Sequence, residues 1–412
     1  MRLHRNLVFA VIDGLDQIFN EDILAHKAVE KLLKRDKRWG SHDRGFIAET
    51  VYEMVRWKRL YMEISEVKTT QSKASLWRMF AVWATLRGIH LPDWKQLEDT
   101  PTRRIKGRFE TLSKIRKIKE SIPDWMDALG VEELGEKKWS KELTALNETA
   151  SVVLRVNTLK TSVDKVQEGL LEEQIETSTN PKYPDALILS QRANVFGTQL
   201  FQEGHFELQD AASQTIAPFL EVKPGMRVVD ACAGAGGKSL HLAALMENKG
   251  QVIALDIYQN KLNELKRRAK RNGAHNIETR WIENSKTIKK LHGKIDRLLI
   301  DAPCSGLGVL RRNPDAKWKL QPDFLETIQK KQADILERYS KMVAPNGKMV
   351  YATCSILPSE NQKQIKRFLA TDVGKEFVLE TEDTLLPSKT GFDGFYRARL
   401  IRNSDPPQPD LK

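Results

Sequence analysis

The hydrophobic positions in the first third of the chain recur at helical spacing. The segments 21–33, 41–55 and 76–86 each place apolar residues three or four positions apart, as one face of a helix requires. Ser41-His42-Asp43-Arg44 offers capping residues for the second of these helices. This pattern predicts an all-helical domain over residues 1–140.

The periodicity changes after residue 140. A helix is expected from Trp139 to Leu146, and Val152–Val156 is then β-branched and strand-like. Val163–Leu171 has helical spacing, and Ala186–Leu189 reads as a further short strand. Residues 141–208 therefore predict a linker helix and a small α+β module.

From about residue 209, strand and helix patterns alternate. Seven strands are predicted, at 227–232, 251–257, 278–282, 295–302, 348–355, 376–380 and 395–401. The main helices between them are expected at 238–246, 259–272 and 322–343. Such alternation is typical of a doubly wound, mostly parallel sheet of the Rossmann-like kind. The prediction is thus a multi-domain protein whose α/β domain spans 209–404 and ends in a polar tail, 405–412.

Charge adds a candidate partner to this picture. The 412 residues carry a net charge of +12, with the basic excess in 1–120 and 201–412 and an acidic stretch between them. Basic regions of this size favour a polyanion such as RNA, although a solvated helix surface gives the same composition. The densest cluster lies between residues 103 and 119, and its first members are the candidate phosphate contacts: Arg103, Arg104, Lys106 and Arg108.

The three cysteines indicate a reducing compartment, because none is closely paired in sequence. No Cys/His spacing fits zinc, so no metal is expected. Asp13 interrupts the apolar run at the N-terminus, and no run of 18 apolar residues exists. We therefore expect a soluble, cytoplasmic protein without a membrane partner, and a monomer.

Two of the cysteines follow predicted strands and begin loops. Cys304 lies in Asp301-Ala302-Pro303-Cys304-Ser305-Gly306, and Cys354 lies in Ala352-Thr353-Cys354-Ser355. Ligands of open α/β sheets bind beyond the carboxyl ends of strands, so the two thiols can share one pocket. The alternative is that they are small buried hydrophobes, the common fate of a free cysteine. Cys232, also at a strand end, is expected to be structural or to contact a ligand through its backbone.

A glycine-rich loop, Gly234-Ala235-Gly236-Gly237-Lys238, joins the first strand of the α/β domain to its first helix. Asp256 ends the second strand, where a carboxylate can accept hydrogen bonds from both ribose hydroxyls. The pair indicates a nucleoside cofactor, against the alternative of a bare glycine turn. The spacing fits neither GxGxxG nor a phosphate-binding P-loop, which disfavours an NAD-dependent oxidoreductase.

These segments together resemble the RNA (cytosine-5) methyltransferases of the Sun/RsmB type, over almost the whole chain. The resemblance rests on residues 230–238, on Asp256, on Asp301–Gly306 with its continuation to Trp318, and on Thr353-Cys354-Ser355 with Glu360-Asn361. Gly234 and Ala235 replace the family's Ala-Pro. Asn284 stands nearest to the place of a cofactor-binding aspartate, in a loop about two residues shorter.

The resemblance implies S-adenosylmethionine as cofactor and a class I methyltransferase fold. It assigns the cofactor to Cys232, Ala233, Gly234, Ala235, Gly236, Gly237, Lys238, Asp256, Asn284 and Asp301. It implies that Cys354 adds to carbon 6 of cytosine, which activates carbon 5, and that Cys304 assists product release. Asp301 would stabilise the adduct. Lys238 would hold Asp301 or lower a thiol pKa, unless it is only a solvated helix start.

The resemblance also implies the substrate. Residues 1–140 look like the helical RNA-binding domain of the antitermination factor NusB, which points to small-subunit (16S) ribosomal RNA. Arg311, Arg312 and Lys317 are expected to grip the strand that carries the flipped-out base. The alternatives are the same reaction on tRNA or large-subunit RNA, or a silent RNA-binding assembly factor. The presence of both Cys304 and Cys354 argues against a silent protein.

Overall fold

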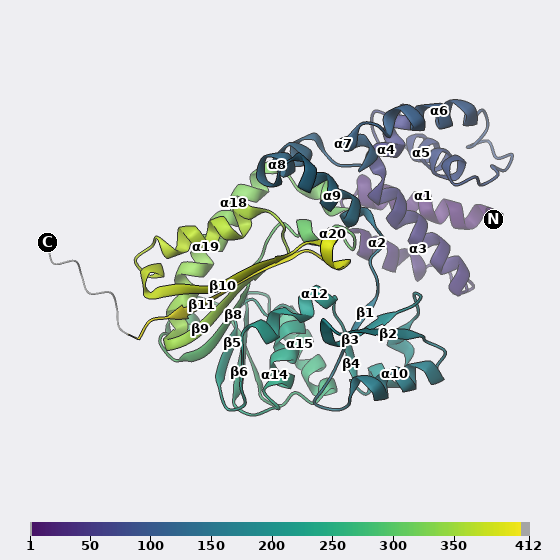
Figure 1. The fold of residues 1–412 in the computed structure, drawn as a ribbon. Helices are drawn as coiled ribbons and strands as arrows, with labels where there is room; N and C mark the ends of the chain where they lie inside the picture. The colour runs from purple at the N-terminus through teal and green to yellow at the C-terminus, as the bar shows by residue number, and fades with distance from the viewer. Residues whose placement is uncertain (1, 405–412) are drawn as a thin grey trace. The chain divides into compact units, whose positions relative to one another are not determined.

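A computed structural model describes residues 2–404, and the predicted tail at 405–412 lies outside them. The chain forms two compact units, shown in Figure 1. The helical unit contains Met1–Glu148 together with Leu310–Pro322, and the α/β unit contains Thr149–Val309 together with Asp323–Lys412. The α/β unit is thus interrupted by a segment that belongs to the helical unit.

The helical unit is built on amphipathic helices whose apolar faces form one core. Its helices are α1 (Arg5–Phe19), α2 (Ala25–Leu33), α3 (Ser41–Arg56), α4 (Lys58–Ser65), α5 (Lys73–Leu86), α6 (Thr102–Leu112), α7 (Arg116–Lys119), α8 (Asp124–Leu134), α9 (Glu136–Asn147) and α17 (Ala316–Lys319). Val8, Ile12 and Leu15 of α1 pack with Phe80 of α5 in that core. The predicted helical domain is confirmed.

The segment 310–322 is integrated into the helical unit by specific contacts. The indole Nε1 of Trp318 donates to the carbonyl oxygen of Val55 at 2.7 Å. The carboxylate of Asp315 accepts from the backbone N–H of Ala25, just at the start of α2, at 2.9 Å. The sequence pattern had assigned this segment to the α/β domain, because side-chain partners so distant in sequence leave no periodic signal.

The α/β unit begins with a four-stranded antiparallel sheet in the order β2-β3-β1-β4. Its strands are β1 (Val153–Val156), β2 (Thr177–Asn180), β3 (Tyr183–Leu189) and β4 (Phe206–Leu208), with helix α10 (Val163–Glu172) between β1 and β2. The polar composition of β2 and the shortness of β4 explain why neither strand was predicted. The small α+β module itself is confirmed.

The rest of this unit is a seven-stranded sheet in the order β10-β11-β9-β8-β5-β6-β7. Its strands are β5 (Arg227–Asp230), β6 (Gln251–Asp256), β7 (Ile277–Trp281), β8 (Ile295–Asp301), β9 (Val343–Thr353), β10 (Phe377–Leu385) and β11 (Phe395–Arg402). The strands β7, β6, β5, β8 and β9 run parallel, and β11 is antiparallel to both β9 and β10. The predicted fold class is confirmed.

The order of the strands brings the chemically distinctive loops together. Strands β9, β8, β5 and β6 are consecutive neighbours, and they carry at their carboxyl ends the Cys354 loop, the Cys304 loop, the glycine loop and Asp256. Because these four strands are parallel, the three loops and Asp256 lie at the same edge of the sheet. No helix within residues 2–404 has the length and apolar character needed to cross a bilayer.

Candidate active site

The two cysteines predicted to share a pocket lie in direct contact. The Sγ atoms of Cys304 and Cys354 are 3.3 Å apart, and both cysteines are free thiols. Strand β8 delivers the first and its parallel neighbour β9 the second, with Asp301 in register with Ala352. The hydrogen bond with Cys354, together with burial, raises the pKa of Cys304 well above its ordinary value. Either thiol can donate the hydrogen bond in this contact.

A lysine–aspartate pair borders the thiols. The Nζ atom of Lys238, in helix α14 (Gly237–Leu245), lies 2.6 Å from a carboxylate oxygen of Asp301. Burial opposes the charge of this ammonium, but Asp301 and the sulfur of Cys354 outweigh burial and raise the pKa of Lys238. The ammonium also faces the ring of Phe395, 5.3 Å from its centroid. Lys238 is thus a cation held in place beside Cys354, and not a solvated helix start.

The glycine loop has a backbone that only glycine adopts easily. Gly234 and Gly236 have φ angles of +54° and +86°. A Cβ on Gly236 would lie 2.0 Å from Cδ1 of Leu265, whereas a Cβ on Gly234 would meet nothing within 4 Å. Gly236 therefore serves close packing against helix α15 (Gln259–Asn272), and Gly234 borders open space that a ligand can occupy.

Asp256 is tied to the same loop. One carboxylate oxygen accepts from the backbone N–H of Gly234 at 2.8 Å, and the other accepts from the N–H of Tyr258 at 2.8 Å. Each oxygen retains a second lone pair. Asp256 can therefore hold the loop and still accept hydrogen bonds from a ribose.

The carbonyl oxygens of the glycine loop are held by two arginines that the sequence did not single out. Arg268 of α15 donates to the carbonyl of Ala235 at 2.8 Å, and Arg155 of β1 donates to that of Gly237 at 2.5 Å. Glu207 of β4 pairs with Arg268 at 2.8 Å. The small module is therefore connected to the glycine loop by buried charges, which no local sequence pattern reveals.

Buried polar groups behind the loop fit a bound ligand. Asp230 is 1% exposed, and burial raises its pKa to about 7 although Ser239 donates to it at 2.7 Å. Its other oxygen, Oδ1, has no hydrogen-bond partner within residues 2–404. Burial likewise raises the pKa of Cys232, so this thiol is neutral, in agreement with a structural role. Ala233 donates its N–H to the carbonyl of Leu255 and so fixes the loop's start.

Asn284 has a local structural role. Its side chain accepts from the N–H of Lys286 at 2.9 Å and so caps the short helix α16 (Ser285–Lys289). Three large side chains near it are exposed at the ends of β6 and β7, namely Ile257, Tyr258 and Trp281. Exposed apolar groups beside a carboxylate with free lone pairs are suited to contact the ring of a ligand. Their position beyond strand ends is the signal that could have identified them.

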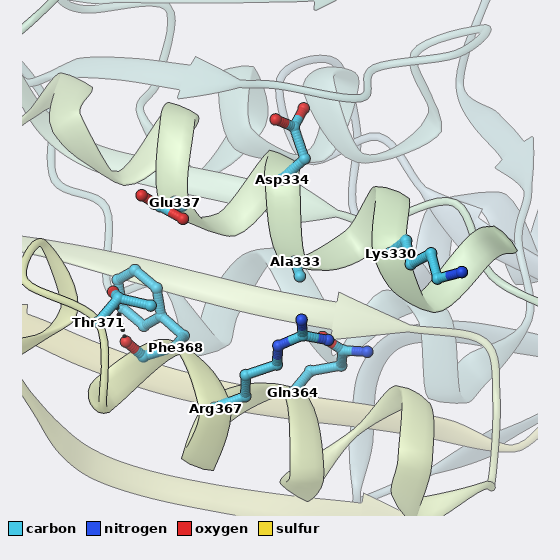
Figure 2. Close-up of a pocket in the computed structure, with 8 residues that line it drawn as sticks. All are labelled: Lys330, Ala333, Asp334, Glu337, Gln364, Arg367, Phe368 and Thr371. Carbon is cyan, nitrogen blue, oxygen red and sulfur yellow. Dashed lines mark hydrogen bonds between the residues drawn. The ribbon is translucent and has the colours of Figure 1, made fainter. Parts of the chain in front are cut away.

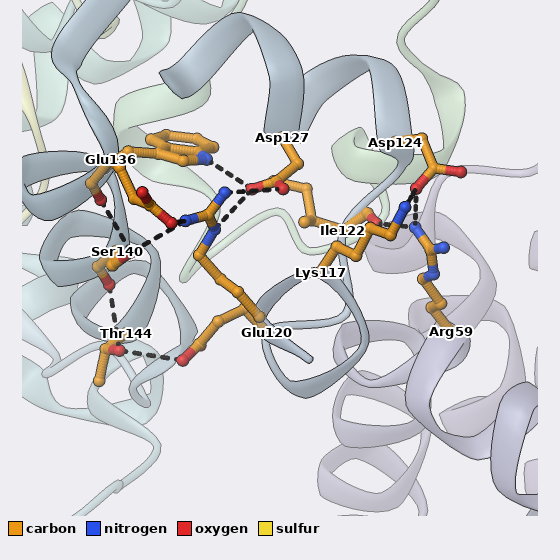
Figure 3. Close-up of polar contacts among 11 residues, drawn as sticks. Arg59, Lys117, Glu120, Ile122, Asp124, Asp127, Glu136, Ser140 and Thr144 are labelled. Atoms are coloured by element: carbon orange, nitrogen blue, oxygen red, sulfur yellow. Dashed lines mark hydrogen bonds and ion pairs between the residues drawn. The ribbon is translucent and has the colours of Figure 1, made fainter. Parts of the chain in front are cut away.

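Much of the basic cluster at 103–119 is engaged within the helical unit. Arg104 and Arg108 both pair with Glu66, at 2.8 Å. Arg116 pairs with Asp127 and Glu136. Lys117 pairs with Asp124, which also pairs with Arg59, in a separate cluster that Figure 3 shows. Of the four predicted phosphate contacts, Arg103 and Lys106 are exposed and make no ion pair within the described residues, so these two are the better placed for RNA phosphates.

Arg311 and Lys317 do not fit their predicted role. Lys317 is 1% exposed, and its Nζ donates to the carbonyls of Arg56, Glu120 and Ser121 and to Oδ1 of Asn147. Arg311 is also buried and donates to the carbonyl of Ala145 at 2.7 Å. Both head groups are buried and hydrogen-bonded within the helical unit, so a strand of RNA cannot reach them in this structure. Partly buried Arg312 remains a candidate.

The α/β unit also has a surface cavity that none of the candidate active-site residues lines. It has a volume of about 330 Å³ and lies between α18 (Pro322–Tyr339) and α19 (Gln362–Leu369). Figure 2 shows its mixed lining, which includes Asp334 and Glu337 opposite Arg367. None of the predicted site residues lines it, so it is not the candidate active site. No cluster of His, Cys, Asp or Glu suited to a metal ion occurs within residues 2–404.

Two family models match parts of this chain. A family model described as 16S rRNA methyltransferase RsmB/F matches residues 217–401, and a ferredoxin-like domain of RsmF/B-like methyltransferases matches 122–196. A Bacillus subtilis protein named probable ribosomal RNA small subunit methyltransferase B is 33% identical over 354 residues, which cover 81% of this chain and 75% of the relative.

A Synechocystis protein of the same name is 37% identical over 259 residues, covering 60% of this chain. The chain spans only 56% of that relative's length. The crystal structure of PH0851 is similar with a TM-score of 0.81 at 25% identity, over 97% of this chain and 99% of that one.

Proposed function

Because the chain belongs to the RsmB/F family of 16S rRNA methyltransferases, we propose that it methylates carbon 5 of a cytosine in small-subunit ribosomal RNA. The observation that carries this proposal is the contact between the thiols of Cys304 and Cys354, beside Lys238 and Asp301. A cytosine methyltransferase needs a thiolate to add to the ring and a second group to manage its departure.

Cys354 is the proposed nucleophile. Its thiolate donates an electron pair to carbon 6 of cytosine, and the ring electrons move so that carbon 5 becomes an enamine carbon. The surroundings of the pair support this assignment, because the ammonium of Lys238, held by Asp301, interacts electrostatically with the sulfur of Cys354. S-adenosylmethionine, when bound, supplies a methyl group on a positively charged sulfur.

Product release reverses the addition. A base takes the proton from carbon 5, the electron pair restores the ring double bond, and the bond between carbon 6 and the Cys354 sulfur breaks with its pair on sulfur. The thiol of Cys304, 3.3 Å away, can hydrogen-bond to that departing sulfur. The carboxylate of Asp301, paired with Lys238, can accept a hydrogen bond from the cytosine edge and so help to position the ring.

We assign the cofactor to the loop 232–238, Asp256, Asp301 and the neighbourhood of Asn284. The open space at Gly234 and the free lone pairs of Asp256 fit the ribose, and the unpartnered oxygen of buried Asp230 fits a polar group. Arg155 and Arg268 hold the loop's carbonyls, so its N–H groups stay oriented towards the ligand.

Substitution of each cysteine tests the mechanism. Cys354→Ala should abolish turnover and give no covalent complex with RNA. Cys304→Ala should methylate but retain a protein–RNA band on a denaturing gel, and this band should need S-adenosylmethionine. The double variant should give none. A band from Cys354→Ala and none from Cys304→Ala would mean that the roles are exchanged.

Bisulfite sequencing tests the substrate. Deletion of the gene should remove a 5-methylcytosine from small-subunit ribosomal RNA, and the wild-type gene should restore it. Loss of the modification from tRNA or large-subunit RNA instead would contradict the assigned substrate while leaving the reaction intact.

A further inference from the structure

A fully buried carboxylate lies beneath the two cysteine loops. Glu360 ends the short helix after the Cys354 loop and is 0% exposed. One of its oxygens accepts from the hydroxyls of Ser305 at 2.5 Å and Ser355 at 2.6 Å. The other accepts from the N–H of Ser305 at 2.8 Å and from Nε2 of Gln332 at 3.0 Å. These four bonds fill the accepting capacity of a carboxylate, so Glu360 has no free site for a substrate or proton.

The two serines are the immediate neighbours of the two cysteines. Ser305 follows Cys304 and Ser355 follows Cys354. Each hydroxyl also accepts from the backbone N–H two residues ahead, at 3.3 Å in the first loop and 3.2 Å in the second. Each serine therefore fixes the turn of its own loop and, through Glu360, fixes that turn relative to the other loop.

Two further ties limit the freedom of the loops. Gln332 of α18 donates to the carbonyl of Pro303 as well as to Glu360, at 3.0 Å in both cases. The N–H of Gly308 donates to the carbonyl of Cys354 at 2.9 Å, and a Cβ on Gly308 would lie 2.8 Å from that oxygen. The backbones on both sides of the thiol pair are thus held, with Glu360 at the centre.

The surroundings of Glu360 distinguish it from an ordinary buried ion pair. Within the described residues no cation pairs with it, and its side-chain partners are neutral donors from the two cysteine loops and α18. A buried charge without a counter-ion is retained only where all its hydrogen bonds are made. Such a group resists any displacement of its partners, because moving one loop leaves the charge undersatisfied.

We propose that Glu360 is the positioning residue that sets the separation of the Cys304 and Cys354 thiols. This inference rests on the proposed function for its chemical meaning, since the separation decides whether Cys304 reaches the sulfur that leaves carbon 6. The hydrogen bonds by which Glu360 holds the two cysteine loops are independent of that function. A displacement near 1 Å at a reacting group lowers rates about 100-fold.

The test uses the full-length protein with Glu360→Gln and, as a matched control, Glu326→Gln, an exposed glutamate of α18. Glutamine keeps the volume but accepts on one oxygen only, so the set of four bonds cannot persist unchanged. The first readout is capture of phenylarsine oxide, which binds two adjacent thiols together. Labelling by a reagent for single thiols serves as its reference.

Glu360→Gln should lower the affinity for phenylarsine oxide at least about tenfold, and the rate of methyl transfer by about 10- to 100-fold. Affinity for S-adenosylhomocysteine should stay within about twofold, because Glu360 contacts no part of the cofactor loop. The control should match the wild type in all three measurements. Wild-type arsenical affinity in Glu360→Gln, or an equal loss of cofactor affinity, would overturn the proposal.

Two serine variants examine the two cysteine loops one at a time. They also keep the proposal testable if Glu360→Gln does not fold. Ser355→Ala should reduce formation of the covalent complex, and Ser305→Ala should prolong its lifetime. Identical effects of both on every step would overturn a positioning role for Glu360. Normal arsenical capture by the wild type with no methylation of any RNA would instead contradict the proposed function and leave the geometric inference standing.

Discussion

Replacement of Lys317 by methionine tests the finding that this lysine is part of the helical unit. Methionine fills a similar volume but removes the hydrogen bonds that the N–H donors of Nζ share among four acceptors. An acceptor that loses its donor in a buried site costs about 1–3 kcal/mol, and relief of the buried charge offsets part of this loss. We expect Lys317→Met to lower the free energy of unfolding by about 2–4 kcal/mol at pH 7.

The dependence on pH gives the sharper expectation. Burial, aided by Arg56, lowers the pKa of Lys317 from 10.5 to about 7. Between these two values the unfolded chain binds the proton and the folded chain releases it, so stability rises with pH over this window. Integrating this difference in bound protons from pH 7 to pH 9 raises the wild type's free energy of unfolding by about 2 kcal/mol, and the methionine variant lacks this increase. The penalty of the substitution should therefore be larger at pH 9 than at pH 7.

Urea unfolding followed by tryptophan fluorescence measures this difference. Every tryptophan except Trp281 lies in the helical unit, so the signal reports on the part of the chain that contains Lys317. The difference between wild type and variant at each pH cancels the titration of other groups. An equal penalty at pH 7 and pH 9 would refute the reasoning, because it would mean that Lys317 stays charged throughout.

Three further expectations concern the cofactor loop and the RNA contacts. Asp256→Ala should lower affinity for S-adenosylhomocysteine at least about tenfold by calorimetry, since each charge-assisted bond is worth about 1.5–3 kcal/mol; unchanged affinity would contradict the assignment. Gly236→Ala should destabilise the α/β unit by at least about 1 kcal/mol in thermal unfolding, because its φ is +86° and its Cβ would overlap Leu265. Arg103→Ala with Lys106→Ala should reduce the salt dependence of RNA binding by about two charges, and an unchanged slope would show a merely solvated surface.

The sheet of the α/β unit was predictable because its strands are short apolar runs separated by helices of strong amphipathic character. All seven strands were found, and helix 259–272 has the bounds that the spacing indicated. The two thiols were also placed correctly in relation to each other, because both follow neighbouring parallel strands. Hydrophobic periodicity and position at a strand end can both be read from a short stretch of sequence, so they predict these features without knowledge of distant contacts.

The roles of the misassigned residues depend on burial and on distant partners, which a local sequence pattern does not show. Arg311 and Lys317 look like RNA contacts because they are basic and follow a catalytic loop, yet burial decides their role. The strength of the 103–119 cluster was overestimated for the same reason, since Glu66, Asp124, Asp127 and Glu136 take up much of its charge. Sequence counts charges, whereas only the structure shows which charges are already paired.

The α/β unit is interrupted close to Cys304, by the segment that carries Arg311 and Lys317. The chain leaves that unit after Val309, contributes 310–322 to the helical unit, and returns at Asp323. Only five residues separate Cys304 from this segment, and the first of them, Ser305, is the one held by Glu360. Arg311 and Lys317, both buried in the helical unit, hold the segment 310–322 in place within that unit. The helical unit is therefore completed by the segment 310–322, whose Trp318 packs against its core, so residues 1–148 in isolation lack a part of that core.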